Sequence, residues 1–190
     1  MKAVTLLLAA AAFGAHAHHD EHDGNGHGAH EHGHGHLNLV LDGNQLMLEF
    51  QAPAADLVGF EHAAKSNEEK AQYARAVDRL KQPDTLFRFA PTAGCKLTQQ
   101  ELNAANKAHD HDHDHQKSDD GHDDHQHDEA GHADIGAMYT YTCALPDKLI
   151  GLEATLFSVY PSLEKLSVQG ILPTGQTAAE LTPSANQLSW

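Results

Sequence analysis

Apolar and polar residues alternate along two short runs that follow residue 36. Leucines occupy every second position of 37–41, and 46–50 repeats the alternation after the pair Asp42-Gly43. A period of two is the spacing of a strand with one buried face. Asp-Gly between two such runs is typical of a tight turn. The pattern therefore predicts a β-hairpin.

The spacing of apolar residues changes to a helical one over residues 66–82. Ser66 and Glu69 have the S-x-x-E spacing of a capping box at a helix start. Apolar residues then recur three or four positions apart as far as Leu80, and Pro83 ends the pattern. We expect one amphipathic helix here.

The rest of the apolar pattern predicts mainly strands. Strand candidates are 86–89, 96–99 and 137–143, with a second hairpin from 166–172 and 177–181. The stretch 149–160 fits a helix and a strand equally well. The fold class expected is α+β: a mainly antiparallel, sandwich-like core of hairpins with one or two helices.

Two histidine-rich tracts interrupt this pattern. Residues 18–36 contain eight histidines, and residues 103–134 contain eight more among ten acidic residues. Neither tract has apolar periodicity to bury, so both are expected to be disordered without metal. About 120 residues remain for a core, which is one ordinary domain. We expect that domain over 37–190, interrupted by the tract at 103–134.

The first 17 residues have the pattern of an export signal. Lys2 precedes an apolar run, 3–13, and Ala15-His16-Ala17 has the small-x-small form of a cleavage site. The run is too short to span a membrane, and no later run is long enough. We expect cleavage after Ala17, a periplasmic location and no membrane span in the mature chain.

The charge of the mature chain narrows its partners. Cleavage would remove one of the 12 basic residues, Lys2, and none of the 27 acidic ones, which leaves a net charge of −16 with histidine neutral. Such a field disfavours nucleic acid and anionic membranes and suits divalent cations. The two cysteines, Cys95 and Cys143, are most simply one disulfide in an exported chain, with a pair of metal thiolates as the alternative.

The density of histidine predicts metal binding, with zinc as the preferred ion. Neutral imidazole binds zinc, cupric copper and nickel, and the chain has few methionines to hold cuprous copper. Calcium is disfavoured because the HDHDHDH run has His115 where an EF-hand loop needs glycine and Gly121 where it needs glutamate. Candidate ligands in this tract are His109, His111, His113, His115, His122, His125 and His127.

A smaller ordered site is expected where the tracts meet the strands. If residues 32–36 continue the strand that begins at Leu37, His32, His34 and His36 project from one face. His62 is the only histidine of the mature chain outside the tracts. The candidate ligands of this site are His34, His36, His62, His132 and Asp134.

Several short motifs occur together in an order that resembles the ZrgA family of periplasmic zinc-binding proteins. They are HGHGHLN at 32–38, GFEH at 59–62, HAD at 132–134 with Cys143 downstream, and LEKLSVQGILPTGQTAAELTP at 163–183. The resemblance covers essentially the whole mature chain. It implies a role in zinc acquisition across the cell envelope with transporter components as partners, and it places Glu61 beside His62 at a site of importance.

The leading functional hypothesis is a non-enzymatic zinc binder that captures the ion and passes it to a transport system. The alternative is buffering or detoxification of zinc, nickel or copper. A two-lobed solute-binding protein would need more core residues than the chain has, and a zinc hydrolase is disfavoured because no HExxH motif is present. A surface scaffold decorated with metal sites would keep its function without the tracts.

Overall fold

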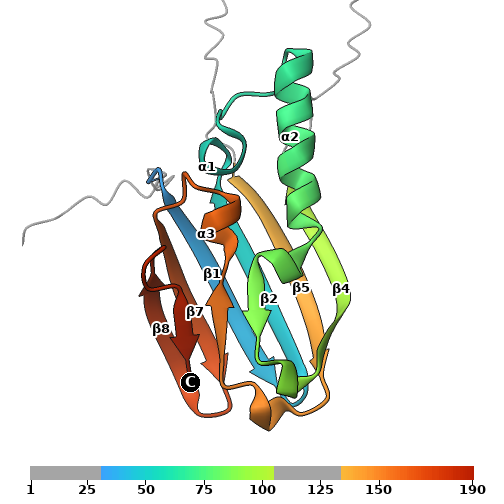
Figure 1. Cartoon of the computed structure of the whole chain (residues 1–190), viewed down its shortest axis with the longest axis vertical. Coiled ribbons are helices and arrows are strands. Elements are labelled where there is room, and N and C mark those ends of the chain that lie inside the picture. The colour runs from blue at the N-terminus through green and yellow to red at the C-terminus, as the bar shows by residue number, and fades with distance from the viewer. Residues whose placement is uncertain (1–30, 105–133) are drawn as a thin grey trace, which may run out of the picture.

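The six long strands pair into one mixed sheet (Figure 1). The computed structural model describes residues 31–104 and 134–190. Within these residues the strand order is β4-β5-β2-β1-β7-β8. The strands are β1 (His34–Asp42), β2 (Gln45–Pro53), β4 (Cys95–Ala104), β5 (Asp134–Cys143), β7 (Lys165–Leu172) and β8 (Gly175–Leu181). The predicted export signal and most of both tracts lie outside the described ranges. Where the tract ends are described they include strand residues, with 34–36 in β1, 103–104 in β4 and Asp134 in β5, so the expected disorder does not extend to these residues.

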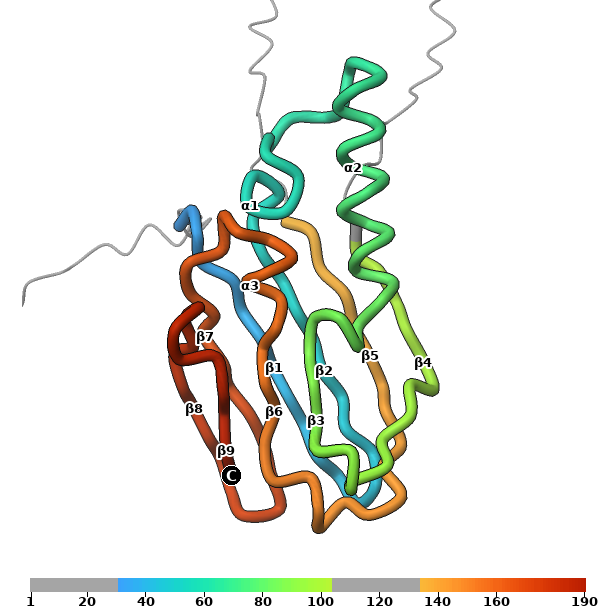
Figure 2. The backbone as a smooth tube through the Cα atoms, viewed as in Figure 1, coloured from blue at the N-terminus to red at the C-terminus, as the bar shows by residue number. Residues whose placement is uncertain are grey.

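A second layer covers one face of this sheet (Figures 1 and 2). It contains the strands β3 (Phe87–Phe89), β6 (Gly151–Ala154) and β9 (Gln187–Ser189), which pair in the order β3-β6-β9. It also contains the helices α1 (Ala54–Val58), α2 (Asn67–Leu80) and α3 (Leu156–Val159), and three 3-10 turns at Pro83–Thr85, Pro91–Ala93 and Pro146–Lys148. The part of the chain that the structure describes has no helix long and apolar enough to cross a membrane.

Most of the predicted elements are confirmed. β1 and β2 form the first hairpin around Gly43, whose φ of +57° suits a tight turn, and β7 and β8 form the second. The ambiguous stretch 149–160 contains both elements in succession, β6 and then α3. The α+β class with a mainly antiparallel sheet is confirmed. One pair, β1 with β7, is parallel, which local alternation does not reveal.

The core lies between the two layers. Leucines at alternate positions of β1 and β2 are fully buried, as the period of two predicts. The rings of Phe87 and Phe89 from β3 meet Phe50, Tyr139 and Tyr141 of the large sheet edge to face. The opposite side of the six-stranded sheet, called here the outer face, carries the polar positions of the same strands, including His34 and His36.

Two buried tyrosines fix the C-terminal half of α2 on the core. The Tyr139 hydroxyl donates a hydrogen bond to the carbonyl oxygen of Leu80 at 2.7 Å, and Tyr160 donates to that of Ala76 at 3.0 Å. Burial raises the pKa of both phenols, so both stay protonated donors. The N-terminal half of α2 projects past the sheet (Figure 1).

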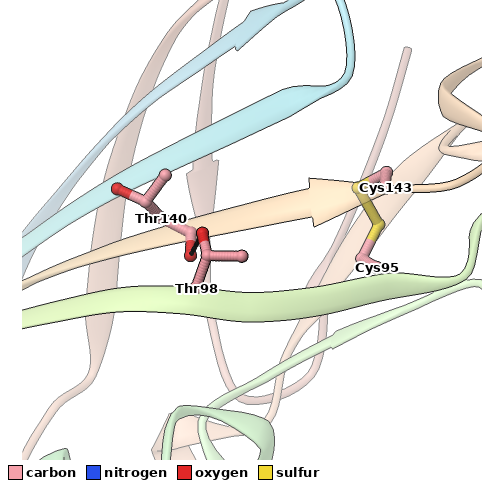
Figure 3. The surroundings of a disulfide bond; sticks show 4 residues. All are labelled: Cys95, Thr98, Thr140 and Cys143. Carbon is pink, nitrogen blue, oxygen red and sulfur yellow. Dashed lines mark hydrogen bonds between the residues drawn. A yellow bond between two sulfur atoms is a disulfide. The ribbon is translucent and has the colours of Figure 1, made fainter.

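The disulfide between Cys95 and Cys143 is confirmed, with an S–S length of 2.04 Å. It joins directly paired residues of β4 and β5, and the Thr98 hydroxyl donates to the carbonyl oxygen of Thr140 nearby, at 3.0 Å (Figure 3). The bridge lies at the end of the β4–β5 ladder opposite to Ala104. The cysteines therefore close the strand pair at the end away from the tract at 103–134.

Candidate metal centre

The described residues that join the two tracts to the fold lie at one end of the molecule. β1 starts there, and β4 ends where β5 starts, with Ala104 paired to Ile135 (Figure 1). Helix α1 and the loop 59–66 lie at this end as well (Figure 2). We call this the histidine end, and the end that carries the cysteines the disulfide end.

A turn separates His32 from the strand that follows it. Gly33 has a φ of +78°, which favours glycine, and the amide of His34 donates to the carbonyl oxygen of Glu31 at 3.2 Å. β1 starts only at His34. Three histidines were expected on one face of this strand, but only His34 and His36 lie on it. His32 precedes the turn at Gly33 and is not part of the strand.

His32 lies beside Glu61. Its Nε2 is 3.5 Å from Glu61 Oε1, and the two side chains are 63% and 26% exposed. This separation is longer than the donor–acceptor distance of a good hydrogen bond. It is close to the roughly 3.4 Å that separates two ligand atoms at the tetrahedral angle when each is about 2.1 Å from zinc. The pair has the spacing of two ligands of one ion.

Asp56 holds the turn that positions His32. This side chain of α1 is 8% exposed, and its Oδ2 accepts a hydrogen bond from the amide of Gly33 at 2.8 Å. Burial raises the pKa of the carboxyl group, and the amide of Gly33 acts in the opposite direction. Asp56 was not among the predicted site residues. The sequence feature that could have identified Asp56 is a single charged residue in the otherwise apolar run AADLV.

His34 and His36 share the outer face at the start of β1. Their rings stack with centroids 5.1 Å apart. His34 Nε2 is 2.7 Å from the Ser167 hydroxyl oxygen, and its Nδ1 is 3.1 Å from Glu31 Oε2. The hydrogen bond to His34 lowers the pKa of Glu31. His34 must exchange one of these contacts to bind an ion, whereas His36 is exposed.

Asp134 lies on the same sheet, two strands away from the histidines. Gln51 of β2 pairs with His36 and donates a hydrogen bond from Nε2 to Asp134 Oδ2 at 2.6 Å. Ser167 and Gln51 are thus polar neighbours that sequence reasoning missed. Both are partners of His36 in the strand register, so only the pairing of β1 with β2 and β7 identifies them.

His62 occupies the loop between α1 and α2. Its ring stacks on Phe60 with centroids 5.1 Å apart, its Nδ1 is 3.0 Å from the carbonyl oxygen of Ala63, and its Nε2 is 3.8 Å from Glu69 Oε1. The Glu69 side chain accepts a hydrogen bond from the Ser66 amide, and the Glu69 amide donates to the Ser66 hydroxyl, which is the capping box that their spacing predicts. The position of Glu69 beside His62 was not predicted.

The candidate ligands form separate groups in the structure. One is His32 with Glu61, another is His34 with His36, and a third is His62 with Glu69. Within residues 31–104 and 134–190, no three His, Cys, Asp or Glu side chains are close enough together to hold a metal ion. The remaining candidates lie outside the described ranges: His109, His111, His113, His115, His122, His125, His127 and His132.

The side chains at the histidine end are imidazoles and carboxylates, and both kinds of group can bind zinc in proteins. The family model described as ZrgA family zinc uptake protein matches residues 29–190. The chain belongs to the ZrgA family of zinc uptake proteins. No curated protein matches it.

Proposed function

We propose that the mature protein captures Zn²⁺ in the periplasm and supports its uptake by transporter components of the cell envelope. Capture uses the two histidine-rich tracts together with a smaller ordered site, and the ion is the cargo of the protein. The protein is a binder without catalytic activity. Membership of a zinc uptake family supports this role.

The tracts act as a collecting surface in this proposal. Many imidazoles and carboxylates on one chain raise the local concentration of the ion near the fold, as linked weak binding sites do. The acidic residues outnumber the basic ones by 27 to 12, so the field of the protein also attracts cations.

The ordered site is proposed at the histidine end. Its ligands come from His32, His34, His36, Glu61 and Asp134, joined by His62 and His132. The observation that carries the proposal is the His32–Glu61 pair, whose Nε2 and Oε1 atoms are 3.5 Å apart beside the point where the N-terminal tract enters the sheet. An ion captured by the N-terminal tract would therefore be close to His32 and Glu61, whose side-chain atoms have the separation of two zinc ligands.

The experiment is a zinc titration of the mature protein beside a variant in which a short Gly-Ser turn replaces residues 105–131. Ala104 pairs with Ile135, so a tight turn can close the gap without disturbing the ladder. We expect the variant to lose the equivalents bound by residues 105–131 and to keep the tightest one. Isothermal titration calorimetry and metal analysis after dialysis measure both quantities.

A matched pair of substitutions tests the ordered site in that shortened background. His32→Ala together with Glu61→Gln should weaken the tightest equivalent, whereas Asn38→Ala and Glu49→Gln, a hydrogen-bonded pair further down the sheet, should leave it unchanged. If the shortened protein binds no zinc tightly, the tight equivalent needs residues 105–131 and the ordered site as proposed is wrong. If the full-length protein binds no zinc at all, the capture function is wrong.

A further inference from the structure

His62 and Glu69 face each other without a direct hydrogen bond. The Nε2–Oε1 distance of 3.8 Å exceeds hydrogen-bond length. It is within about 0.4 Å of the separation of two ligands on tetrahedral zinc. The two side chains are 51% and 30% exposed, so small rotations can bring the atoms together.

The tautomer of His62 is fixed by its backbone contact. A carbonyl oxygen only accepts, so the Nδ1 that lies 3.0 Å from the Ala63 oxygen carries the proton. The lone pair of the neutral ring is then on Nε2, the atom that faces Glu69. A histidine whose second nitrogen donates to a backbone carbonyl is the usual arrangement of a metal ligand.

Glu69 is oriented in a matching way. Its Oε2 accepts hydrogen bonds from the amides of Lys65 and Ser66 at 2.8 and 2.9 Å. These amides lower the pKa of the carboxyl group, so it is an anion at neutral pH. The carboxylate is thus held through one oxygen, and the other is directed at His62.

From this geometry we infer that His62 Nε2 and Glu69 Oε1 form an open two-ligand zinc position at the start of α2, from which the ion passes to an acceptor. The inference rests on the proposed zinc-capture function and adds Glu69 as a ligand. Two protein ligands leave two positions of a tetrahedral ion for water or for the imidazole and carboxylate groups of an acceptor. The N-terminus of α2 disfavours a cation, which keeps the ion exchangeable.

The test follows the ring nitrogens of His62 by long-range ¹H–¹⁵N NMR correlation while Zn²⁺ is added to the full mature protein. Resonances are assigned with a His62→Gln variant. Before zinc is added, Nδ1 should carry the proton. Zinc should then shift Nε2 continuously, because an open position exchanges its ion quickly.

Matched variants of the same helix turn isolate Glu69. Glu69→Gln keeps a capping-box acceptor, since glutamine is accepted at this position, but removes the carboxylate. It should weaken zinc binding at His62 about tenfold. Glu68→Gln removes the same charge one residue earlier, from an exposed side chain, and should leave the His62 titration unchanged.

The outcomes separate the inference from the proposed function. If His62 Nε2 does not respond while His34 or His36 does, the two-ligand position is wrong and zinc capture stands. If no histidine responds, both are wrong. An equal titration in Glu69→Gln excludes Glu69 as a ligand, and slow exchange at His62 contradicts the open position.

Discussion

The two ends of the large sheet are formed by the same strands but carry different side-chain chemistry. At the disulfide end, Cys95 and Cys143 are paired covalently across β4 and β5. At the histidine end, the same ladder finishes at Ala104 and Ile135, and the neighbouring strands β1 and β2 carry the polar side chains of His34, His36 and Gln51. The disulfide and the proposed zinc ligands thus lie at opposite ends of the sheet, so changes at one end should leave the other intact.

The largest expected effect is on stability at the disulfide end. Replacing both cysteines by serine removes a bridge between residues 48 positions apart, which should lower the free energy of unfolding by about 4 kcal/mol. Zinc affinity should not change, because the bridge is at the far end of the ladder. Urea denaturation and zinc titration check the two statements. A fall in zinc affinity in the folded variant would show that the ends are coupled.

Acid should act mainly at the histidine end. Imidazole binds zinc only when it is neutral, and its ordinary pKa is about 6.5. Lowering the pH from about 7.5 to about 5.5 should therefore weaken zinc binding by the tracts about a hundredfold where two histidines share an ion. Calorimetry at the two pH values measures this. Equal affinity and stoichiometry at both would contradict binding by the tract histidines.

Asp56 connects stability to the histidine end. Asp56→Ala leaves the buried amide of Gly33 without its acceptor, which should cost about 2 kcal/mol in unfolding free energy and weaken the ordered zinc site. Asp56→Asn keeps an acceptor and is the control. Chemical denaturation with and without zinc distinguishes the two variants. A loss of stability with zinc binding unchanged would show that the turn does not position a ligand.

The raised pKa of Asp56 adds a pH dependence of known sign. The folded state holds the proton of this carboxyl group more tightly than the unfolded state, so its contribution favours folding at low pH and is lost as pH rises through the raised pKa. Wild type should gain stability relative to Asp56→Asn between about pH 7 and about pH 4. Denaturation curves at both pH values check this, and a difference that stays constant contradicts the assignment.

The smallest expected effect is that of one exposed ligand. His36→Ala should weaken the ordered zinc site about tenfold, or about 1.4 kcal/mol, and leave the unfolding free energy nearly unchanged because the side chain is exposed. Asn38→Ala, two positions further along the same face, is the matched control. Equal zinc titrations for the two variants would remove His36 from the proposed site.

Much of the fold was predictable because its information is local. Alternation predicted both hairpins, and the capping box predicted α2, whose side-chain hydrogen bonds join Ser66 and Glu69 as expected. Helix α1 and strand β9 were not predicted. The five residues of α1 form little more than one turn, and Gln187–Ser189 is too short to show a period. The parallel pairing of β1 with β7 was also missed, because a register between distant segments leaves no trace in either one.

The candidate site was predictable in its residue types but not in its grouping. The expected alternation of His32 with His34 and His36 failed at Gly33, whose positive φ starts a turn. Glycine occurs in both strands and turns, so the sequence alone could not show whether residue 33 continues the strand or forms a turn. The anchoring of that turn by Asp56 joins residues 23 positions apart, which no local pattern reveals.

By itself, the sequence determined most of the elements, the disulfide partners and the abundance of imidazole and carboxylate groups. Periodicity is a local property, and the cysteine pairing and the composition follow from residue counts. The tertiary structure decided which of these groups meet. It put the disulfide at the end of the ladder away from the tract, and it brought Glu61 to His32 and Glu69 to His62. Ligand atoms must lie within a few ångströms of each other to share an ion, and only the folded chain sets such distances.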